Sequence, residues 1–141
     1  MPHRDERDVL STLPGYALRR AANAMMSDFA TRLGTADLRI SDASVLQIIG
    51  ERTDMTSSEI GKVLDIQRAN MVPLVNRLEK AGLIARKPID RKSSAIVLTS
   101  AGLERLATAR TITSQFEDAL IARIPEQHRQ CFVETLNALW D

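Results

Sequence analysis

Apolar side chains recur at helical spacing in several separate stretches of the chain. The first stretch forms one stripe over about four turns, with its apolar residues three or four positions apart: Leu18, Ala22, Met25, Phe29 and Leu33. Ser11 or Thr12 can cap the start of this helix, Pro14 suits its first turn, and Gly34 can end it. The pattern therefore predicts a long first helix.

Three shorter helices are predicted after Gly34. The second begins near Ser41 and carries Val45, Ile48 and Ile49 on its buried face. The letters TSSE, starting at Thr56, form a capping box for a third helix, because Thr56 can bond the Glu59 amide and Glu59 can reach back. The fourth helix lies within DIQRANMVPLVNRLEKAGLI, which starts at Asp65. Its core-facing residues and closing glycine are Leu74, Val75, Leu78, Leu83 and Gly82.

The pattern then changes to that of a β-hairpin. Two β-like segments, 83–87 and 95–98, flank a polar turn that contains Pro88, Asp90 and two serines. The turn carries more basic side chains than a hairpin requires.

The end of the chain returns to helical spacing. Between 101 and 124 the apolar stripe consists of Leu103, Leu106, Ile112, Phe116, Leu120 and Ile124. Pro125 breaks this helix and can begin a last one, whose stripe is Phe132, Leu136, Leu139 and Trp140.

The order of these elements is that of a winged helix-turn-helix. The third helix, a tight turn and the fourth helix form the helix-turn-helix, whose second helix enters the DNA major groove. The hairpin directly after it forms a two-stranded β wing, and a basic wing can reach the adjacent minor groove. We therefore predict a mainly α fold in a single domain of 141 residues.

The charge distribution supports a nucleic-acid site near the fourth helix. The net charge is only +1, but residues 67–93 contain seven basic and two acidic side chains. That window carries +5, so the other 114 residues carry −4. A basic cluster on a near-neutral chain is expected of a DNA-binding surface, although a solvated polar face gives the same charge pattern.

The remaining composition narrows the class of protein. Aromatic residues make up 4% of the chain, so the core must be mainly aliphatic, which favours helices. The single cysteine, Cys131, excludes an internal disulfide and fits a reducing compartment. No stretch approaches the roughly 20 apolar residues of a membrane span, and MPHRDERDV lacks the apolar run of a signal peptide. We expect a cytoplasmic protein with no membrane partner.

Catalysis and cofactor binding are not indicated. The chain has two histidines, His3 and His128, and one cysteine, so it lacks the ligand spacing of a zinc site. It contains no glycine-rich phosphate loop and no nucleophile elbow. We expect no enzyme activity, no cofactor and no metal.

The sequence also resembles a known family. The segment TSSEIGKVLDIQRANMVPLVNRLEKAGLIARKPIDRKSSAIVLTSAG is similar to the winged helix-turn-helix of the MarR family of bacterial transcriptional regulators. The letters LPGYALRRA, starting at Leu13, resemble the first helix of that family. The resemblance covers nearly the whole chain. It implies a DNA-binding lobe at 36–100 between dimerisation helices at 11–34 and 101–141.

This resemblance implies a homodimer in which the first and last helices of both chains interlace. The stripes support this independently, because a monomer would struggle to cover the large apolar groups near the chain end: Phe116, Phe132, Leu136, Leu139 and Trp140. A two-fold dimer presents two recognition helices, so the expected target is a pseudo-palindromic operator in double-stranded DNA. We expect a repressor, although sequence alone does not separate repression from activation.

Base contacts are expected from the leading end of the fourth helix. Gln67, Arg68 and Asn70 lie there, and Arg can pair with guanine while Gln or Asn can pair with adenine. Val72 and Pro73 follow, and they could contact only thymine methyl groups.

Other side chains are expected to contact the DNA backbone. The family pattern implies this role for Arg77, later in the same helix, and for Arg86 at the start of the wing. Thr56 and Ser57 begin the third helix, where amides and hydroxyls could hold a phosphate. Thr56 could equally be a plain helix cap, or serve both purposes.

At the wing tip, the family usually has an acid, one further residue and then an arginine. Here that last position is Lys92, with Arg91 between it and Asp90. Either Lys92 is the wing-tip contact or Arg91 has taken the role. Asp90 is expected to brace the wing, through Arg86, rather than to touch DNA.

The family resemblance also implies control by a ligand. Many relatives release DNA when a small aromatic or phenolic anion binds between the dimer helices and the DNA-binding lobe. Tyr16, Arg20, Met26 and Phe29 lie in the region of such a pocket, although core and dimer packing would also explain them.

Two other functions compete with this interpretation. A winged-helix protein-interaction module is one, but such modules often lose the basic wing that this chain keeps. A redox-sensing regulator is the other, through Cys131, which lies beside Phe132 in an apolar helix where burial is expected.

Pro73 leaves the start of the recognition helix open. In one interpretation Asn70 caps the helix and Pro73 lies in the first turn, where its missing amide costs nothing. In the other the helix starts near Gln67, so that Pro73 removes the bond to the Ala69 carbonyl and bends the helix. The core spacing of Leu74 favours the second.

Overall fold

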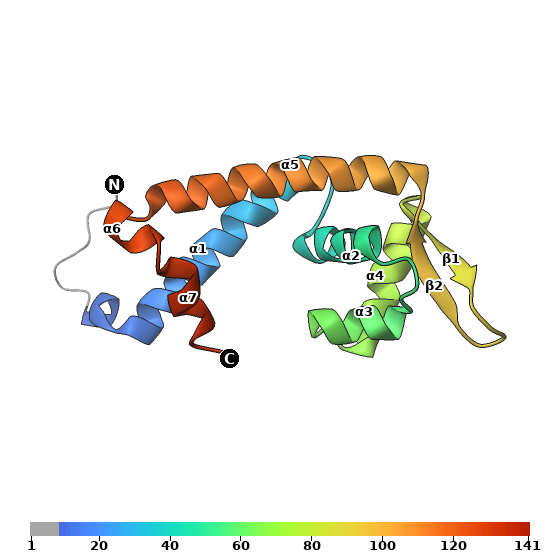
Figure 1. Cartoon of the computed structure of the whole chain (residues 1–141), viewed down its shortest axis with the longest axis horizontal. Coiled ribbons are helices and arrows are strands. Elements are labelled where there is room, and N and C mark those ends of the chain that lie inside the picture. The colour runs from blue at the N-terminus through green and yellow to red at the C-terminus, as the bar shows by residue number, and fades with distance from the viewer. Residues whose placement is uncertain (1–8) are drawn as a thin grey trace.

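The computed structural model describes residues 9–141, so His3 lies outside it. The chain is mainly helical with one two-stranded antiparallel sheet, as predicted (Figure 1). Its elements in chain order are a 3-10 helix η1 (Val9–Thr12), α1 (Pro14–Gly34), α2 (Ile40–Glu51), α3 (Ser57–Leu64), α4 (Arg68–Lys80), β1 (Ile84–Pro88), β2 (Ser94–Leu98), α5 (Ser100–Arg123), α6 (Glu126–Arg129) and α7 (Phe132–Asn137).

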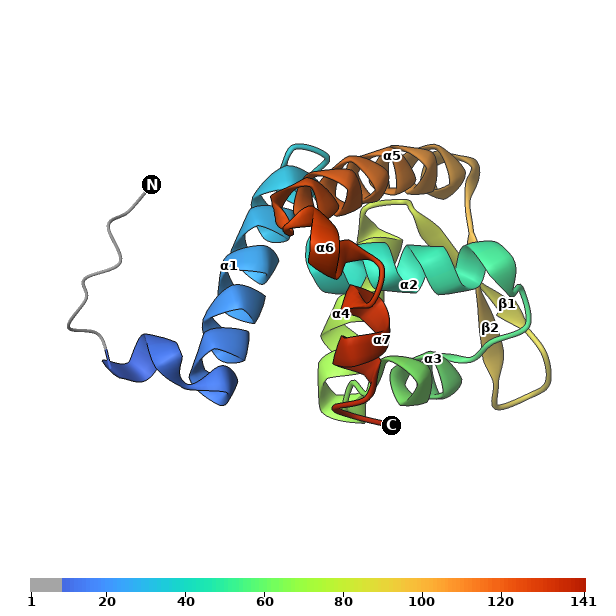
Figure 2. The same cartoon turned by 60° about the vertical axis from the view of Figure 1, so that its left-hand side comes forward.

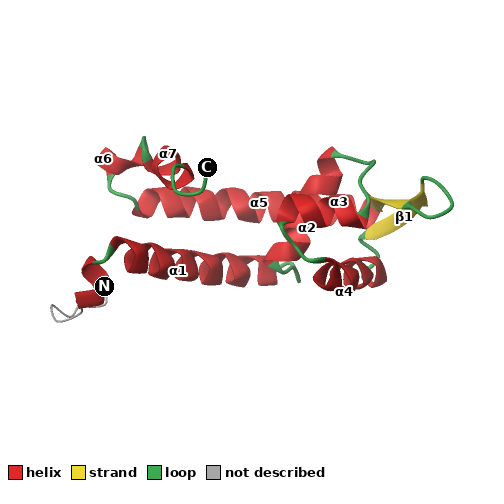
Figure 3. Cartoon of the chain, turned by 90° about the horizontal axis from the view of Figure 1, so that it is seen from below, coloured by secondary structure: helices red, strands yellow, loops and turns green. Residues whose placement is uncertain are grey.

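Helix α5 connects two groups of elements. Helices α2, α3 and α4 and the β1–β2 hairpin gather at its N-terminal end, while α6 and α7 lie at its other end (Figure 1). Helix α1 packs beside α5 (Figures 2 and 3). No helix within residues 9–141 is long and apolar enough to cross a membrane.

The hydrophobic core lies in the α2–α4 lobe and its junction with α1 and α5. The largest fully buried side chains come from α1, α2, α3, α4 and β2, namely Leu33, Val45, Leu46, Ile49, Ile60, Met71, Val75 and Ile96. Each short helix buries one apolar stripe against the others, which is why their periodicity predicted them correctly.

The start of α1 differs from its prediction. The N-cap is Leu13 rather than Ser11 or Thr12, and Thr12 instead bonds the Val9 carbonyl within η1. Pro14 occupies the first helical position, where its missing amide has no helical partner to lose. Gly34 is the last residue of α1, as expected, but the C-cap is Thr35 rather than the glycine.

Helix α4 resolves the question raised by Pro73. Its N-cap is Gln67, and Arg68 is its first helical residue, so the helix starts where the family alignment places it. Pro73 therefore lies inside the helix and leaves the Ala69 carbonyl without a helical donor. Ala69 is exposed, so water can satisfy that carbonyl. The expected bend at Pro73 stays a prediction.

The β1–β2 hairpin is joined to the helix-turn-helix by a further backbone contact. Its register pairs Ile84 with Leu98 and Pro88 with Ser94. The amide of Ile96 also donates to the Met55 carbonyl at 2.9 Å, just before α3. The start of α3 is thus fixed to the inner strand of the wing, a link that the sequence pattern did not predict.

The last helix is not continuous as predicted. Pro125 caps α6, but the chain breaks at Gln130 and Cys131 before α7 begins. The predicted stripe begins only at Phe132, so the polar residues 126–130 before it gave no sign of the break. Cys131 is consequently exposed at the cap of α7 instead of buried.

Candidate nucleic-acid interface

A cleft runs between α3, α4 and the wing. Its volume is about 770 Å³. The residues that line it include Thr56, Ser57, Ser58, Lys62, Gln67, Arg68, Val72, Arg86 and Lys92. Six of these were expected from the sequence as DNA contacts. Ser58 and Lys62 were missed, although their position on the exposed side of α3 could have indicated them.

The N-terminal end of α4 presents two uncommitted polar side chains. The Gln67 side chain makes no capping hydrogen bond, although Gln67 is the N-cap residue. Arg68 is exposed and has no ion-pair partner among residues 9–141. A cation at the positive end of a helix is unfavourable in isolation, so Arg68 is better explained by an external anion or base acceptor. Asn70 is exposed too but does not line the cleft.

The N-terminal end of α3 is capped internally. The Thr56 hydroxyl accepts the Glu59 amide at 3.2 Å and donates to the Glu59 carboxylate at 3.2 Å. The predicted Thr56 cap is therefore confirmed, but the reciprocal half of the capping box is not, because the Glu59 side chain reaches the hydroxyl rather than the Thr56 backbone amide. Ser57 stays on the cleft wall as the expected phosphate contact.

Arg77, for which the family pattern implied a contact with the DNA backbone, does not line this cleft. Its guanidinium forms an ion pair with Asp42 of α2, which is 4% exposed. The same carboxylate accepts the Arg39 amide at 2.8 Å. Because Asp42 is buried, Arg77 is required as its counter-charge. We therefore assign Arg77 a structural role.

Arg86 is also held within the protein, although it lines the cleft. Its guanidinium bonds the Glu79 carboxylate at 3.2 Å and the Asn76 amide oxygen at 3.3 Å. These contacts join strand β1 to the outer face of α4. Arg86 thus fixes the wing relative to the recognition helix.

Asp90 braces the wing turn, but its partners are not those expected. Its carboxylate accepts the backbone amides of Lys92 and Ser93, both at 2.8 Å, and not the Arg86 side chain. These two hydrogen bonds hold the pKa of the Asp90 carboxyl below its usual value, and the bond from the Lys92 amide has the larger effect. Arg91 and Lys92 are both exposed in this turn, and neither has an ion-pair partner in the described chain. Only Lys92 also lines the cleft.

The terminal helices expose a second, apolar surface. Large hydrophobic side chains that remain exposed in the single chain include Leu10, Leu13, Leu18, Met26, Val133, Leu139 and Trp140. Leu139 and Trp140 were expected here, whereas Phe132 and Leu136 are half-buried. Phe116 departs from its prediction, because its ring stacks on Phe29 at 4.6 Å and is 3% exposed. It packs α1 on α5 and so belongs to the core of the single chain rather than to its exposed surface.

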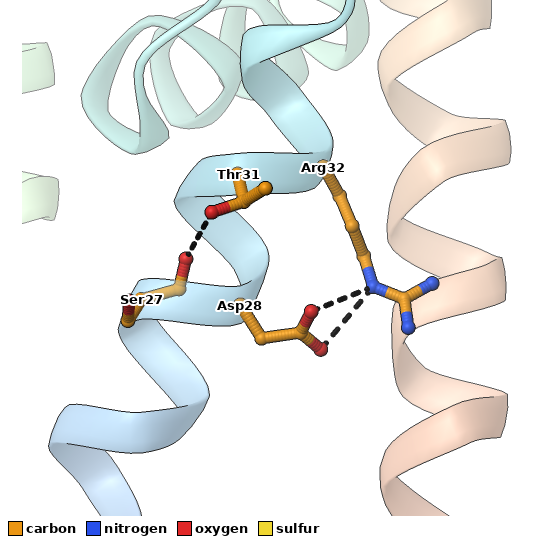
Figure 4. Close-up of polar contacts among 4 residues, drawn as sticks. All are labelled: Ser27, Asp28, Thr31 and Arg32. Atoms are coloured by element: carbon orange, nitrogen blue, oxygen red, sulfur yellow. Dashed lines mark hydrogen bonds and ion pairs between the residues drawn. The ribbon is translucent and has the colours of Figure 1, made fainter.

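An apolar cavity of about 1050 Å³ lies between α1, α5, α6 and α7. Its walls include Met25, Phe116, Leu120 and Phe132, with Asp28, Arg32, Arg123 and His128 among its polar lining residues. Asp28 and Arg32 bond each other at 3.2 Å on the side of α1 next to α5 (Figure 4). Thr31 instead bonds the Ser27 carbonyl at 3.0 Å.

The four residues expected to form a ligand pocket lie elsewhere. Met26 is exposed, and Phe29 is occupied by its stacking on Phe116. The Tyr16 ring has the guanidinium groups of Arg19 and Arg20 at 5.4 Å and 5.8 Å from its centroid. None of the four lines the cavity, because α1 presents a neighbouring face to it.

Comparison with known proteins identifies similar regulators. A family model described as the MarR family matches residues 38–94. A putative transcriptional regulatory protein for the hcr operon of Thauera aromatica is 27% identical over 129 residues, which cover 89% of this chain and 78% of that protein.

Two solved structures of the transcriptional repressor CouR are similar over nearly their whole length. CouR bound to a 23-mer DNA duplex is 31% identical, with a TM-score of 0.85 over 94% of this chain and 95% of that one. CouR bound to p-coumaroyl-CoA is 30% identical, with a TM-score of 0.82 over 92% and 93% of the two chains.

The wing turn generates a pH-dependent prediction. Because the folded-state pKa of Asp90 is lowered, the ionised carboxylate stabilises the turn fully at pH values above its unfolded-state pKa, near 4. That stabilisation is lost as the pH falls through the lower, folded-state pKa. In an NMR titration, the Lys92 and Ser93 amides should shift with a midpoint below about 4. Asp90→Asn should abolish that transition, and Asp90→Ala should speed hydrogen exchange of both amides at pH 7. An unchanged titration in Asp90→Asn would show that Asp90 does not brace the turn.

Proposed function

The chain belongs to the MarR family of transcriptional regulators, and we propose that it is a homodimeric repressor that binds a pseudo-palindromic operator. The observation that carries the proposal is the exposed, unpaired Arg68 at the start of α4, with Lys62 and Lys92 on the same cleft. The N-terminal end of a helix carries partial positive charge, and the exposed cations beside the start of α4 add to it. Together they favour binding of DNA phosphates and base acceptors.

We divide the DNA contacts into two groups. Gln67 and Arg68 are the base-reading candidates because their side chains are uncommitted. Ser57, Lys62 and the wing-turn cations supply backbone contacts, which position the protein without reading sequence. Arg77 and Arg86 hold α4 in place and are not in either group.

The exposed apolar surface supports dimerisation through the terminal helices. Leu13, Leu18 and Trp140 are between 42% and 76% exposed in the single chain, which is unusual for such side chains unless a partner covers them. This surface supports the proposed division into a lobe at 36–100 and dimerisation helices at 11–34 and 101–141. A two-fold dimer would present both α4 helices to successive major grooves.

We further propose that a phenolic acyl-CoA or a smaller aromatic acid releases the DNA. CouR has been captured with p-coumaroyl-CoA, and the cavity between α1 and α5 to α7 is lined largely by apolar side chains. A ligand acts on DNA binding only if it prefers one of two states of the dimer, so its effect should be measured as competition with the operator.

Other functions receive less support. An interaction module without DNA binding would have no use for free cations on the cleft. The relatives are transcriptional regulators, so we propose a non-catalytic role on chromosomal DNA in the cytoplasm.

Removing the two wing-turn cations tests the DNA-binding proposal. The operator can be selected by the wild-type protein from random duplex DNA and its affinity measured by fluorescence anisotropy over a range of salt. Arg91→Ala/Lys92→Ala should weaken binding and lower the slope of log affinity against log salt by about 0.9 for each phosphate that the protein no longer neutralises. Arg110→Ala, on the exposed side of α5, is the matched control and should leave the slope unchanged. An unaltered slope in the double variant would exclude the wing from the interface.

Filling the apolar cavity tests the effector proposal. Met25 lines the cavity, whereas the adjacent Met26 does not. Met25→Trp should still bind the operator, but p-coumaroyl-CoA should no longer release it. Met26→Trp, once shown to form the same dimer as the wild type, should still be released by p-coumaroyl-CoA. Coenzyme A alone is the ligand control. The assignment would be contradicted if p-coumaroyl-CoA still released Met25→Trp from DNA. It would also be contradicted if coenzyme A alone released the wild-type protein as well as p-coumaroyl-CoA does.

A further inference from the structure

The outer face of α4 is apolar at its centre. The helix buries Met71, Leu74, Val75 and Leu78 against the lobe. The opposite side exposes Ala69, Val72, Pro73 and Asn76, and only the last of these has a polar side chain. Val72 is 53% exposed, so packing among residues 9–141 leaves much of this side chain uncovered.

The polar groups on either side of Val72 have other roles. Arg68, one turn earlier, is free to reach outward. Asn76, one turn later, is engaged by the Arg86 guanidinium, which Glu79 also holds. A base edge opposite Val72 would therefore meet its methyl groups first, and the nearest other polar groups on this face are the Ala69 carbonyl and the Asn76 NH2 group.

The position of Val72 makes this apolar group rigid. A β-branched side chain in a helix has one strongly preferred rotamer, so Val72 loses little freedom when it makes a contact. Pro73 directly after it offers no amide that could bind a base or water in its place. Val72 also lines the cleft beside Arg68.

From these observations we propose that Val72 is a specificity-determining residue that reads the C5-methyl group of thymine. The thymine methyl is the apolar group that the base edges present in the major groove, and its position separates T·A from A·T pairs. The inference rests on the proposed operator binding and adds a defined base preference to it.

The test removes the methyl group from DNA without altering base pairing. Starting from the operator selected by the wild-type protein, each thymine is replaced in turn by uracil, and affinity is measured by anisotropy with the full chain. Burial of one methyl group contributes about fourfold in affinity, so a symmetry-related pair of thymines should contribute about 15-fold. Wild-type protein should lose that factor at one such pair, and Val72→Ala should be nearly indifferent there.

Two variants complete the design. Val72→Ile keeps a branched apolar side chain and should retain the sensitivity to uracil. Val63→Ala removes another exposed valine, on α3 and outside the cleft, and should also retain it.

The outcomes separate this inference from the proposed function. If the protein selects a specific operator but uracil leaves its affinity unchanged at every thymine position, only the role of Val72 is overturned and the proposed function stands. Equal sensitivity in Val72→Ala and wild type would assign the methyl contact to another group and also overturn it. Failure to select any specific DNA would remove the proposed function itself.

Discussion

The buried ion pair between Asp42 and Arg77 is the interaction on which the geometry of the DNA-binding surface depends. Asp42 lies on α2 with its carboxylate almost inaccessible to water, where an uncompensated charge would cost several kcal/mol. The Arg77 guanidinium and the Arg39 amide provide the compensation. Since Arg77 belongs to α4, the recognition helix cannot move away from α2 without exposing or abandoning that charge.

Further contacts extend this constraint from α4 to the rest of the interface. Arg86 ties strand β1 to α4, and the Ile96 amide ties strand β2 to the segment before α3. The Asp90 carboxylate then closes the wing turn on its own backbone amides. A surface connected in this way is ordered before DNA arrives, so binding costs less conformational freedom.

Local patterns in the sequence predicted most of the fold. Helical stripes, the Thr56 cap and Gly82 identified the helices, because each depends on residues within a few positions of one another. The pairing of Arg77 with Asp42 spans 35 positions and leaves no local pattern, so the sequence did not reveal this structural contact. Phe116 was misassigned for the same reason, since its partner Phe29 lies on α1. The break at Cys131 follows five polar residues, 126–130, which carry no apolar spacing, so only the folded backbone reveals it.

A double-mutant cycle on Asp42 and Arg77 tests the central claim most directly, with unfolding free energy and the salt slope of operator binding measured on the same proteins. Arg77→Met should cost about 3 kcal/mol by leaving the buried Asp42 carboxylate without a counter-charge. Adding Asp42→Asn should recover more than about 1 kcal/mol of that loss, and the salt slope should not change. Additive losses in stability, together with a slope lowered by about 0.9 in Arg77→Met, would contradict the account and make Arg77 a phosphate contact.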